Sequence, residues 1–256
     1  MCSETLQLAL LFLGVSAIYA SVGFGGGSSY LAVLSLFAIP MTAMRSTSLM
    51  CNIIVVAGGT YIYWQNGYFN LKKMLPLVAA SVPLAFIGGM TPIKERVFFL
   101  LLGCCLVVAA LLMLLQNMFL KKNNVENSLN DTNEFSPVKN ALLGGGIGLL
   151  SGVVGIGGGI FLSPVLNLSR WDTPKNVAAT ASFFILTNSI AGLAGQFWQH
   201  RFATDWSLGL SLLLAVFIGG QVGSRFSALK INALHVRQVT AALVFYAGAN
   251  ILWTHF

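Results

Sequence analysis

The sequence predicts an all-α, polytopic membrane protein with two related halves, and three observations carry this prediction. Hydrophobic residues make up 56% of the chain and charged residues only 8%, whereas a soluble domain of this length needs a far more charged surface. The hydrophobic residues gather into ten blocks that match the lengths of membrane helices or of shorter helical arms. Three short motifs of the first five blocks recur, in the same order, in the second five.

The ten blocks divide into two sets of five around one polar stretch. They cover 6–22, 28–39, 47–65, 74–92 and 97–120, and then 140–155, 159–169, 176–199, 206–224 and 238–254. The stretch between the sets, 121–139, is rich in Asn, Ser and charged residues. It predicts a flexible cytoplasmic linker between a first transmembrane repeat, 1–120, and a second, 140–256. The first block follows Glu4 without any Lys or Arg, so we expect a retained membrane helix and not a signal peptide.

The repeat rests on three motif pairs at nearly constant offsets of 132, 134 and 131 residues. The pairs are Gly23-Phe-Gly-Gly-Gly27 with Gly155-Ile-Gly-Gly-Gly159, Tyr63-Trp64-Gln65 with Phe197-Trp198-Gln199, and Ile87-Gly88-Gly89 with Ile218-Gly219-Gly220. Agreement in order and offset indicates a duplicated unit, which is frequent in membrane transporters.

The short second block of each half decides the expected topology. A helix over 28–39 reaches only about 18 Å, well short of a hydrocarbon core of about 30 Å. Either it completes a broken helix with 6–22, or it is the returning arm of a hairpin. The hairpin places ten Lys and Arg on one side of the membrane and four on the other, whereas the broken helix gives eight and six. The positive-inside rule therefore favours the hairpin, with both termini outside.

Each half then contains a short-helix hairpin and three spanning helices. Because three is an odd number of crossings, the two halves enter the membrane in opposite orientations, as in inverted-topology repeats.

The glycine motifs fall at the hairpin tips, where non-helical backbone is tolerated only if it is buried in protein or faces a watery cavity. Glycine lets the backbone approach a ligand closely. The helices that begin near Ser28 and Ile160 would direct unpaired N–H groups and a partial positive charge toward the middle of the bilayer, which favours an anion. The alternative is close helix packing through small residues, which we prefer for Gly144-x-x-x-Gly148 and Gly219-x-x-x-Gly223.

The segments after the hairpins are rich in small polar side chains. These side chains can bond a neighbouring helix or a carbonyl one turn back, or they can line a site for an oxyanion at the interface of the repeats. The candidate substrate-binding residues are Gly25, Gly26, Gly27, Ser28, Ser29, Thr47, Ser48, Asn52, Gly157, Gly158, Gly159, Ile160, Thr180, Ser182 and Asn188.

Ionisable side chains are missing from the predicted membrane segments. All seven carboxylates and all three histidines fall in loops or near helix ends, so a proton relay through the membrane is not expected. Arg45 lies just before the third block, where it either extends to the lipid headgroups or attracts anions at an outer mouth. The sequence shows no metal-ligand spacing, catalytic triad or cofactor motif, and its basic residues are too scattered for nucleic-acid binding. It therefore does not predict an enzyme.

The doubled glycine motif, each copy in an apolar hairpin followed by a helix rich in Thr and Ser, resembles the sulfite exporter TauE/SafE family of membrane permeases. The resemblance covers nearly the whole chain apart from the linker. It implies transport of small sulfur-containing or organic anions across the cell membrane. The second half has Thr180-Ala181-Ser182 where the family often shows adjacent Thr and Ser, as at Thr47 and Ser48.

The function expected from the sequence is transport of a small anion by alternating exposure of a site near the membrane midplane. The rival is a membrane assembly or biogenesis factor that transports nothing. The lack of a titratable group in the predicted spans suits this rival, because it leaves the energy coupling of transport unexplained. A polar cavity between the hairpin tips would favour the transporter, and a dry packed centre would favour the rival.

Overall fold

The computed structural model describes residues 2–21, 25–37, 39–122, 136–226 and 233–255, and every regular element in this part of the chain is an α-helix. The ten helices are α1 (Cys2–Ser21), α2 (Gly27–Leu36), α3 (Met41–Gln65), α4 (Leu71–Met90), α5 (Glu95–Lys122), α6 (Pro137–Val154), α7 (Gly159–Leu168), α8 (Pro174–Trp198), α9 (Trp206–Phe226) and α10 (Ala233–His255). Each helix overlaps one of the ten predicted apolar blocks, although several blocks run one to three residues past the end of their helix, and the all-α class is confirmed. Residues 123–135, most of the predicted linker, lie outside the described residues, and α5 and α6 extend into its two ends.

Six of the described helices are long and apolar enough to cross a membrane. They are α3, α4, α5, α6, α8 and α9. Five of these, α3, α4, α5, α8 and α9, are helices that the sequence predicted to span, whereas α6 was predicted as a hairpin arm. The remaining predicted span, α10, has a described apolar part that covers only 240–254. The hairpin arms α2 and α7 have ten residues each, about 15 Å of helix, and confirm that the second block of each half is too short to span alone.

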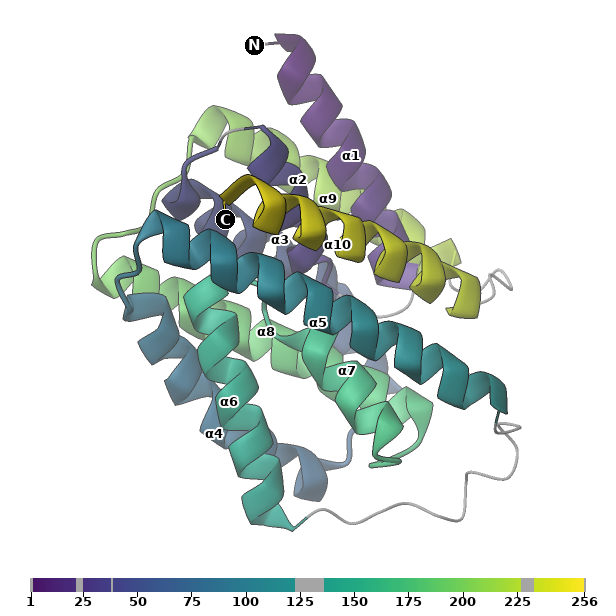
Figure 1. Ribbon diagram of the computed structural model, residues 1–256. Coiled ribbons are helices and arrows are strands. Elements are labelled where there is room, and N and C mark those ends of the chain that lie inside the picture. Colours follow the sequence, from purple (N-terminus) through teal and green to yellow (C-terminus); the bar gives the residue numbers. More distant parts are fainter. Residues whose placement is uncertain (1, 22–24, 38, 123–135, 227–232, 256) are drawn as a thin grey trace.

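The two halves are interleaved in the bundle (Figure 1). Helix α4 of the first half packs along α6 of the second, and α9 of the second half packs along α1 of the first. Helices α5 and α10 lie side by side on one flank, and α3 and α8 cross at the centre. Exchanging the halves therefore converts the α4–α6 pair into the α1–α9 pair and leaves the α5–α10 and α3–α8 pairs unchanged.

Glycine allows two of these pairs to approach closely. A Cβ atom added at Gly144, Gly148 or Gly152 of α6 would collide with the backbone of α4 at residues 77, 81 and 85, respectively. A Cβ atom at Gly219 or Gly223 of α9 would collide with the backbone of α1 at residues 13 and 17. The packing role expected for these small residues is confirmed. Because both residue numbers rise together in each series, α4 runs parallel to α6 and α1 runs parallel to α9.

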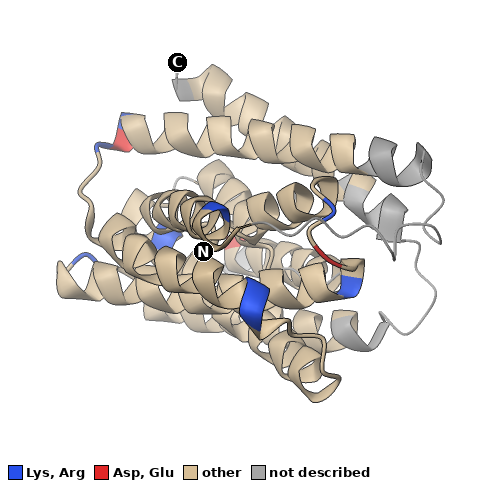
Figure 2. Ribbon diagram, turned by 90° about the horizontal axis from the view of Figure 1, so that it is seen from below, with Lys and Arg blue, Asp and Glu red and all other residues tan. Residues whose placement is uncertain are grey.

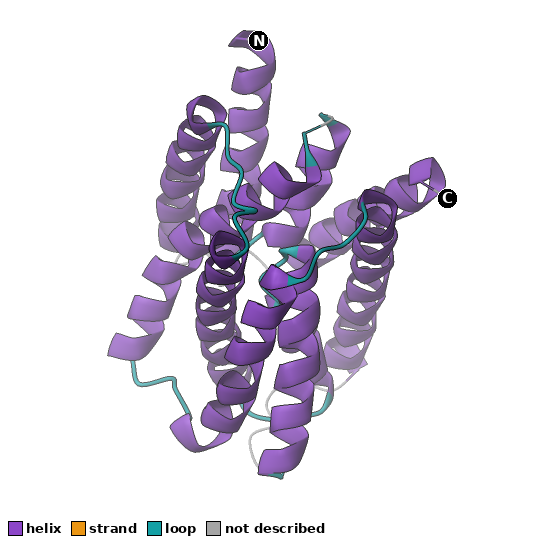
Figure 3. Ribbon diagram, turned by 90° about the vertical axis from the view of Figure 1, so that its left-hand side faces the viewer, coloured by secondary structure: helices purple, strands orange, loops and turns teal. Residues whose placement is uncertain are grey.

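The central helices α3 and α8 run antiparallel. Ser46 near the start of α3 bonds Gln196 near the end of α8, and Thr60 near the end of α3 bonds Ser182 in the first half of α8. This gives the bundle two distinct ends (Figure 3). We call the end where α3 begins and α8 ends the terminal face, since both chain termini lie there, and the end where α4, α6 and α8 begin the linker face.

The described charged residues occur mainly near helix ends and connections, and the long apolar parts of the helices are nearly free of them (Figure 2). This distribution suits a chain whose helices lie in lipid. One residue, Arg45, departs from this pattern.

Candidate functional site at the hairpin tips

Glycine in the left-handed conformation shapes both hairpin tips. Gly26 has φ of 80° and is the N-cap of α2, and Gly158 has φ of 83° and is the N-cap of α7. Gly155 and Gly157 also have positive φ, a region that residues with a Cβ rarely adopt. Neither N-cap glycine has a side chain to satisfy the first N–H groups of its helix. Both short helices therefore present N–H donors and the positive end of the helix dipole at the tips.

The two tips meet beside Asn52, at the middle of the bundle. The Asn52 Nδ2 atom donates a 2.9 Å hydrogen bond to the carbonyl oxygen of Ile156 in the second tip. A Cβ atom on Gly25 would lie 2.5 Å from Asn52 Oδ1, and one on Gly157 would lie 2.6 Å from Asn52 Nδ2. Asn52 lies near the midpoint of α3, and Ile185, which also contacts Gly25 and Gly157, lies near the midpoint of α8. The tips are therefore at mid-length of the helices that cross at the centre.

A small cavity lies between the tips. It measures about 20 Å³, which is room for roughly one water molecule. Its polar lining comes from Tyr19, Ser28, Asn52 and Gln116, together with the backbone of the tip glycines, and its apolar lining includes Ile156, Ile160 and Ile185. An anion of several heavy atoms requires the surrounding helices to separate, so the site is occluded in this conformation.

Two amide atoms at this cavity are buried without a hydrogen-bond partner among the described residues. They are Asn52 Oδ1 and Gln116 Nε2; Gln116 is only 2% exposed and Asn52 is fully buried. An unsatisfied buried polar group costs about 1–3 kcal/mol, so proteins keep such groups mainly where a ligand or water completes them. The cavity thus has a mixed polar and apolar lining, and two of its buried amide atoms lack a partner among the described residues.

Seven of the predicted site residues line this cavity. They are Gly25, Gly26, Gly27, Ser28, Asn52, Gly159 and Ile160. Gly157 contacts Asn52 beside it, and Gly158 packs against Phe184 and Ile147.

The other predicted site residues lie away from the cavity lining. Ser48 donates to the carbonyl oxygen of Gly27, Ser29 bonds Tyr19, and Ser182 bonds Thr60 across the α3–α8 crossing. Thr180 and Asn188 are fully buried, and their side-chain polar atoms have no partner in the described part of the chain. Thr47 lines a separate hollow at the terminal face.

The sequence reasoning missed Tyr19 and Gln116, which both line the cavity. Gln116 carried a usable signal, since it is the first amide after a long apolar run in α5. Tyr19 carried little, because an aromatic residue in an apolar block is usually read as packing. Its hydroxyl lies 2.7 Å from the Ser29 hydroxyl, so it links α1 to the start of α2.

Arg45 corrects two predictions. It lies within α3, which begins at Met41 and not at the apolar block from Thr47, so this membrane helix carries a buried ionisable side chain. Arg45 does not extend toward headgroups either, since it is 2% exposed. Its Nη2 atom donates to the carbonyl oxygens of Gly152, at 3.0 Å, and Gly88, at 3.4 Å. Both carbonyls lie near helix C-termini, where the dipole favours a cation.

Comparisons with known proteins agree with this architecture. A model of the family described as sulfite exporter TauE/SafE matches residues 8–251. A probable membrane transporter protein, y4hK, of Sinorhizobium fredii (strain NBRC 101917 / NGR234) is 32% identical over 258 residues, which cover 99% of this chain and 100% of the relative. A probable membrane transporter protein, YdhB, of Bacillus subtilis (strain 168) is 24% identical over 87% of this chain and 89% of its own length. No solved structure matches the chain.

The bundle of apolar helices and these relatives together define a multi-pass membrane transporter and not an enzyme. The chain belongs to the sulfite exporter TauE/SafE family.

Proposed function

We propose that this transporter carries a small anion, a sulfur oxyanion or an organic sulfonate or carboxylate, across the inner cell membrane. One observation carries the proposal: the N-termini of two short helices, each capped by a left-handed glycine, converge on one cavity with buried polar groups at mid-length of the bundle. Helix N-termini bind anions through free N–H groups and the helix dipole. The Gln116 amide adds a neutral donor that is buried and unpaired among the described residues.

In this proposal the candidate site holds the anion without a full countercharge. Arg45 is bound to helix-end carbonyls, and the cavity lining has no charged side chain. A neutral lining of N–H and amide donors binds an anion firmly enough for selection and still releases it, as a transport site must. Alternating exposure would follow from movement of the two halves as inverted-topology repeats, with the anion released on either side in turn.

The test is ligand-dependent stabilisation of the purified protein. Sulfite, sulfate, thiosulfate, sulfoacetate and acetate would each be added at equal ionic strength, with chloride as the reference. A ligand at about 100 times its Kd stabilises the folded state by about 2.7 kcal/mol, which raises the melting temperature by several degrees. We expect at least one sulfur-containing anion to do so. If every anion matches chloride, the tips are not an anion site, and the assembly-factor interpretation gains support.

A further inference from the structure

The two ends of the bundle differ in how the centre is covered. At the terminal face a hollow of about 680 Å³ lies between the end of α2, the start of α3 and the segment before α9, and Ile39, Thr42, Thr47 and Thr204 are among its lining residues. We call it the vestibule. The hairpin arms α2 and α7 are offset by 132 residues, so the position of Ile39 corresponds to Trp171 at the linker face.

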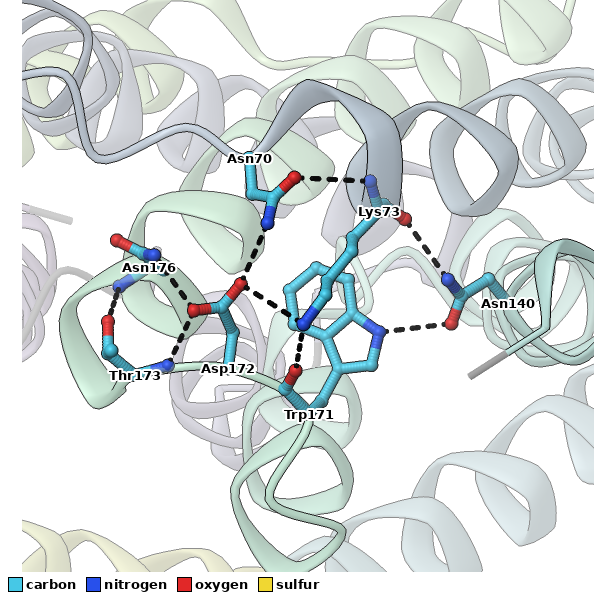
Figure 4. A network of polar contacts seen from close by, with 7 residues as sticks. All are labelled: Asn70, Lys73, Asn140, Trp171, Asp172, Thr173 and Asn176. Carbon is cyan, nitrogen blue, oxygen red and sulfur yellow. Dashed lines mark hydrogen bonds and ion pairs between the residues drawn. The ribbon is translucent and has the colours of Figure 1, made fainter. Parts of the chain in front are cut away.

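At the linker face, Trp171 occupies the corresponding position and is fully buried. Its indole Nε1 donates a 3.0 Å hydrogen bond to Asn140 Oδ1, and the Asn140 amide donates to the backbone carbonyl of Lys73. The Lys73 ammonium in turn lies 5.6 Å from the centre of the Trp171 ring and donates a 2.9 Å bond to the Trp171 carbonyl oxygen (Figure 4). Trp171 is thus held at its indole N–H by Asn140, and at its ring and backbone carbonyl by Lys73.

Asp172 extends this network. Its carboxylate lies 3.7 Å from the Lys73 ammonium and accepts hydrogen bonds from the side-chain amides of Asn70 and Asn176 (Figure 4). The backbone N–H of Thr173 donates to the same carboxylate, and the Thr173 hydroxyl caps α8. Asp172 is therefore held both by its own half and by the first half of the chain.

The network joins the two halves at one end of the bundle only. Asn70 and Lys73 belong to the first half, and Asn140, Trp171, Asp172, Thr173 and Asn176 belong to the second. Its ion pair is partly exposed, with Lys73 at 18% and Asp172 at 8%, so it adds little fixed stability. Each of these contacts is weak by itself, and together they join the two halves of the chain. Such contacts suit a closure that must open once in every transport cycle.

We propose that Trp171 and the Lys73–Asp172 network form the gate at the linker face, and that this gate is closed in this occluded conformation. The proposal rests on the proposed transport function. Opening of the gate separates Asn70 and Lys73 from Trp171 and Asp172, which exposes the cavity between the hairpin tips to the linker side. The anion then leaves, or enters, through the space that Trp171 had filled.

The first test measures access from the linker face. A reporter cysteine replaces Ile160, which lines the central cavity, in a protein without native cysteines. An impermeant thiol reagent is added on the linker side of oriented membrane vesicles. Since a closed gate leaves the open state as a minor population of about 0.1–10%, we expect Trp171→Ala to speed labelling at least about tenfold. Trp198→Ala, an exposed tryptophan of α8, is the matched control and should not change the rate.

A second variant covers the case in which Trp171→Ala does not fold. Lys73→Met keeps most of the length of the side chain but removes the ion pair and the bond to the Trp171 carbonyl, and it should also speed labelling. The proposal is overturned if the reporter in the parent protein already labels rapidly from the linker side, or if the folded variants label as slowly as the parent.

A third experiment distinguishes failure of the gate from failure of the anion site. Asn70→Cys and Asp172→Cys, combined in one protein and joined by a short bifunctional thiol reagent, should block transport while anion-dependent stabilisation persists; each single cysteine with the same reagent is the control. Transport at the parent rate by the cross-linked protein would reject the gate. If no anion stabilises even the parent, the proposed function fails, and the labelling result still decides whether the linker face is gated.

Discussion

The guanidinium of Arg45 in α3 donates a 3.0 Å hydrogen bond to the backbone carbonyl of Gly152, near the end of α6. The bond joins the first half of the chain to the second and places a buried cation beside the second hairpin tip. A Cβ atom on Gly155, the C-cap of α6, would lie 3.2 Å from the Cα of Arg45, so the backbones of α3 and the tip are in close contact. Arg45 therefore fixes where the second tip lies against α3.

Loss of this bond should weaken the fold. In Arg45→Met the carbonyl of Gly152, one of the last carbonyls of α6, would remain buried without this donor, at a cost of about 1–3 kcal/mol. We expect a lower melting temperature, measured on the purified protein in detergent. Lys94→Met, at an exposed loop position, is the control and should change little. An Arg45→Met protein as stable as the parent would show that the guanidinium is not needed to hold the tip.

The tip glycines offer a test of close approach to a ligand. In Gly25→Ala the methyl carbon would lie 2.5 Å from Asn52 Oδ1, so it would enter the space beside the cavity. We expect anion-dependent stabilisation to fall far more than expression or melting temperature. Gly146→Ala in α6 is the control, since its methyl group would meet open space. Equal binding by Gly25→Ala and the parent would mean that the first tip is only structural.

Gly26→Ala and Gly158→Ala test the left-handed caps themselves. Each adds the cost of an alanine at φ near +80°, roughly 1 kcal/mol or more. Each methyl group would also press on a ring, that of Tyr30 or Phe184. We therefore expect lower stability together with weaker binding. Gly67→Ala, which has φ of 70° in an open turn, measures the backbone cost alone, and the tip variants should exceed it in both effects.

The sequence predicted the helices well and the side-chain directions less well. Apolar blocks located all ten helices, because burial in lipid or in the bundle selects the same residues. The predicted start of α3 was wrong because Met41–Ser46 mixes polar and apolar residues, and its N-cap, Pro40, lacks a capping side chain. Arg45 was therefore taken as a loop residue. Its true partners, two glycine carbonyls on α4 and α6, are main-chain atoms, and no sequence pattern names them.

Within the candidate site, the same limit explains what was found and what was missed. The glycine motifs predicted the tips because a helix break between apolar blocks has few other causes. Thr47 was predicted at the centre, but it faces the vestibule, because the direction of a side chain around a helix depends on how the helix packs. Gln116 lies 64 residues beyond Asn52 in the chain, and only the folded bundle brings α5 against the tips.

The Gln116 amide should separate stability from binding. Gln116→Leu removes a buried donor that has no described partner and replaces it with a side chain of similar size. The melting temperature should stay equal or rise, since about 1–3 kcal/mol of unsatisfied polar burial is removed, while anion-dependent stabilisation should weaken. Such opposite effects are typical of functional sites. Gln199→Leu, at an exposed helix end, is the control. A destabilised Gln116→Leu protein with unchanged binding would assign the amide to the fold.

The last prediction concerns orientation in the membrane. The hairpin topology gives ten Lys and Arg to the linker face and four to the terminal face, and one of those four, Arg45, is buried within α3 and lies outside any loop. The positive-inside bias is therefore stronger than the sequence count, and the linker face should be cytoplasmic. Single cysteines replace Ser3 and Asn130 in a protein without native cysteines, and an impermeant thiol reagent is added to intact cells. Position 3 should react and position 130 should react only after the membrane is permeabilised. Reaction at position 130 alone in intact cells would reverse the orientation, and with it the side of the membrane on which the proposed gate at Trp171 opens.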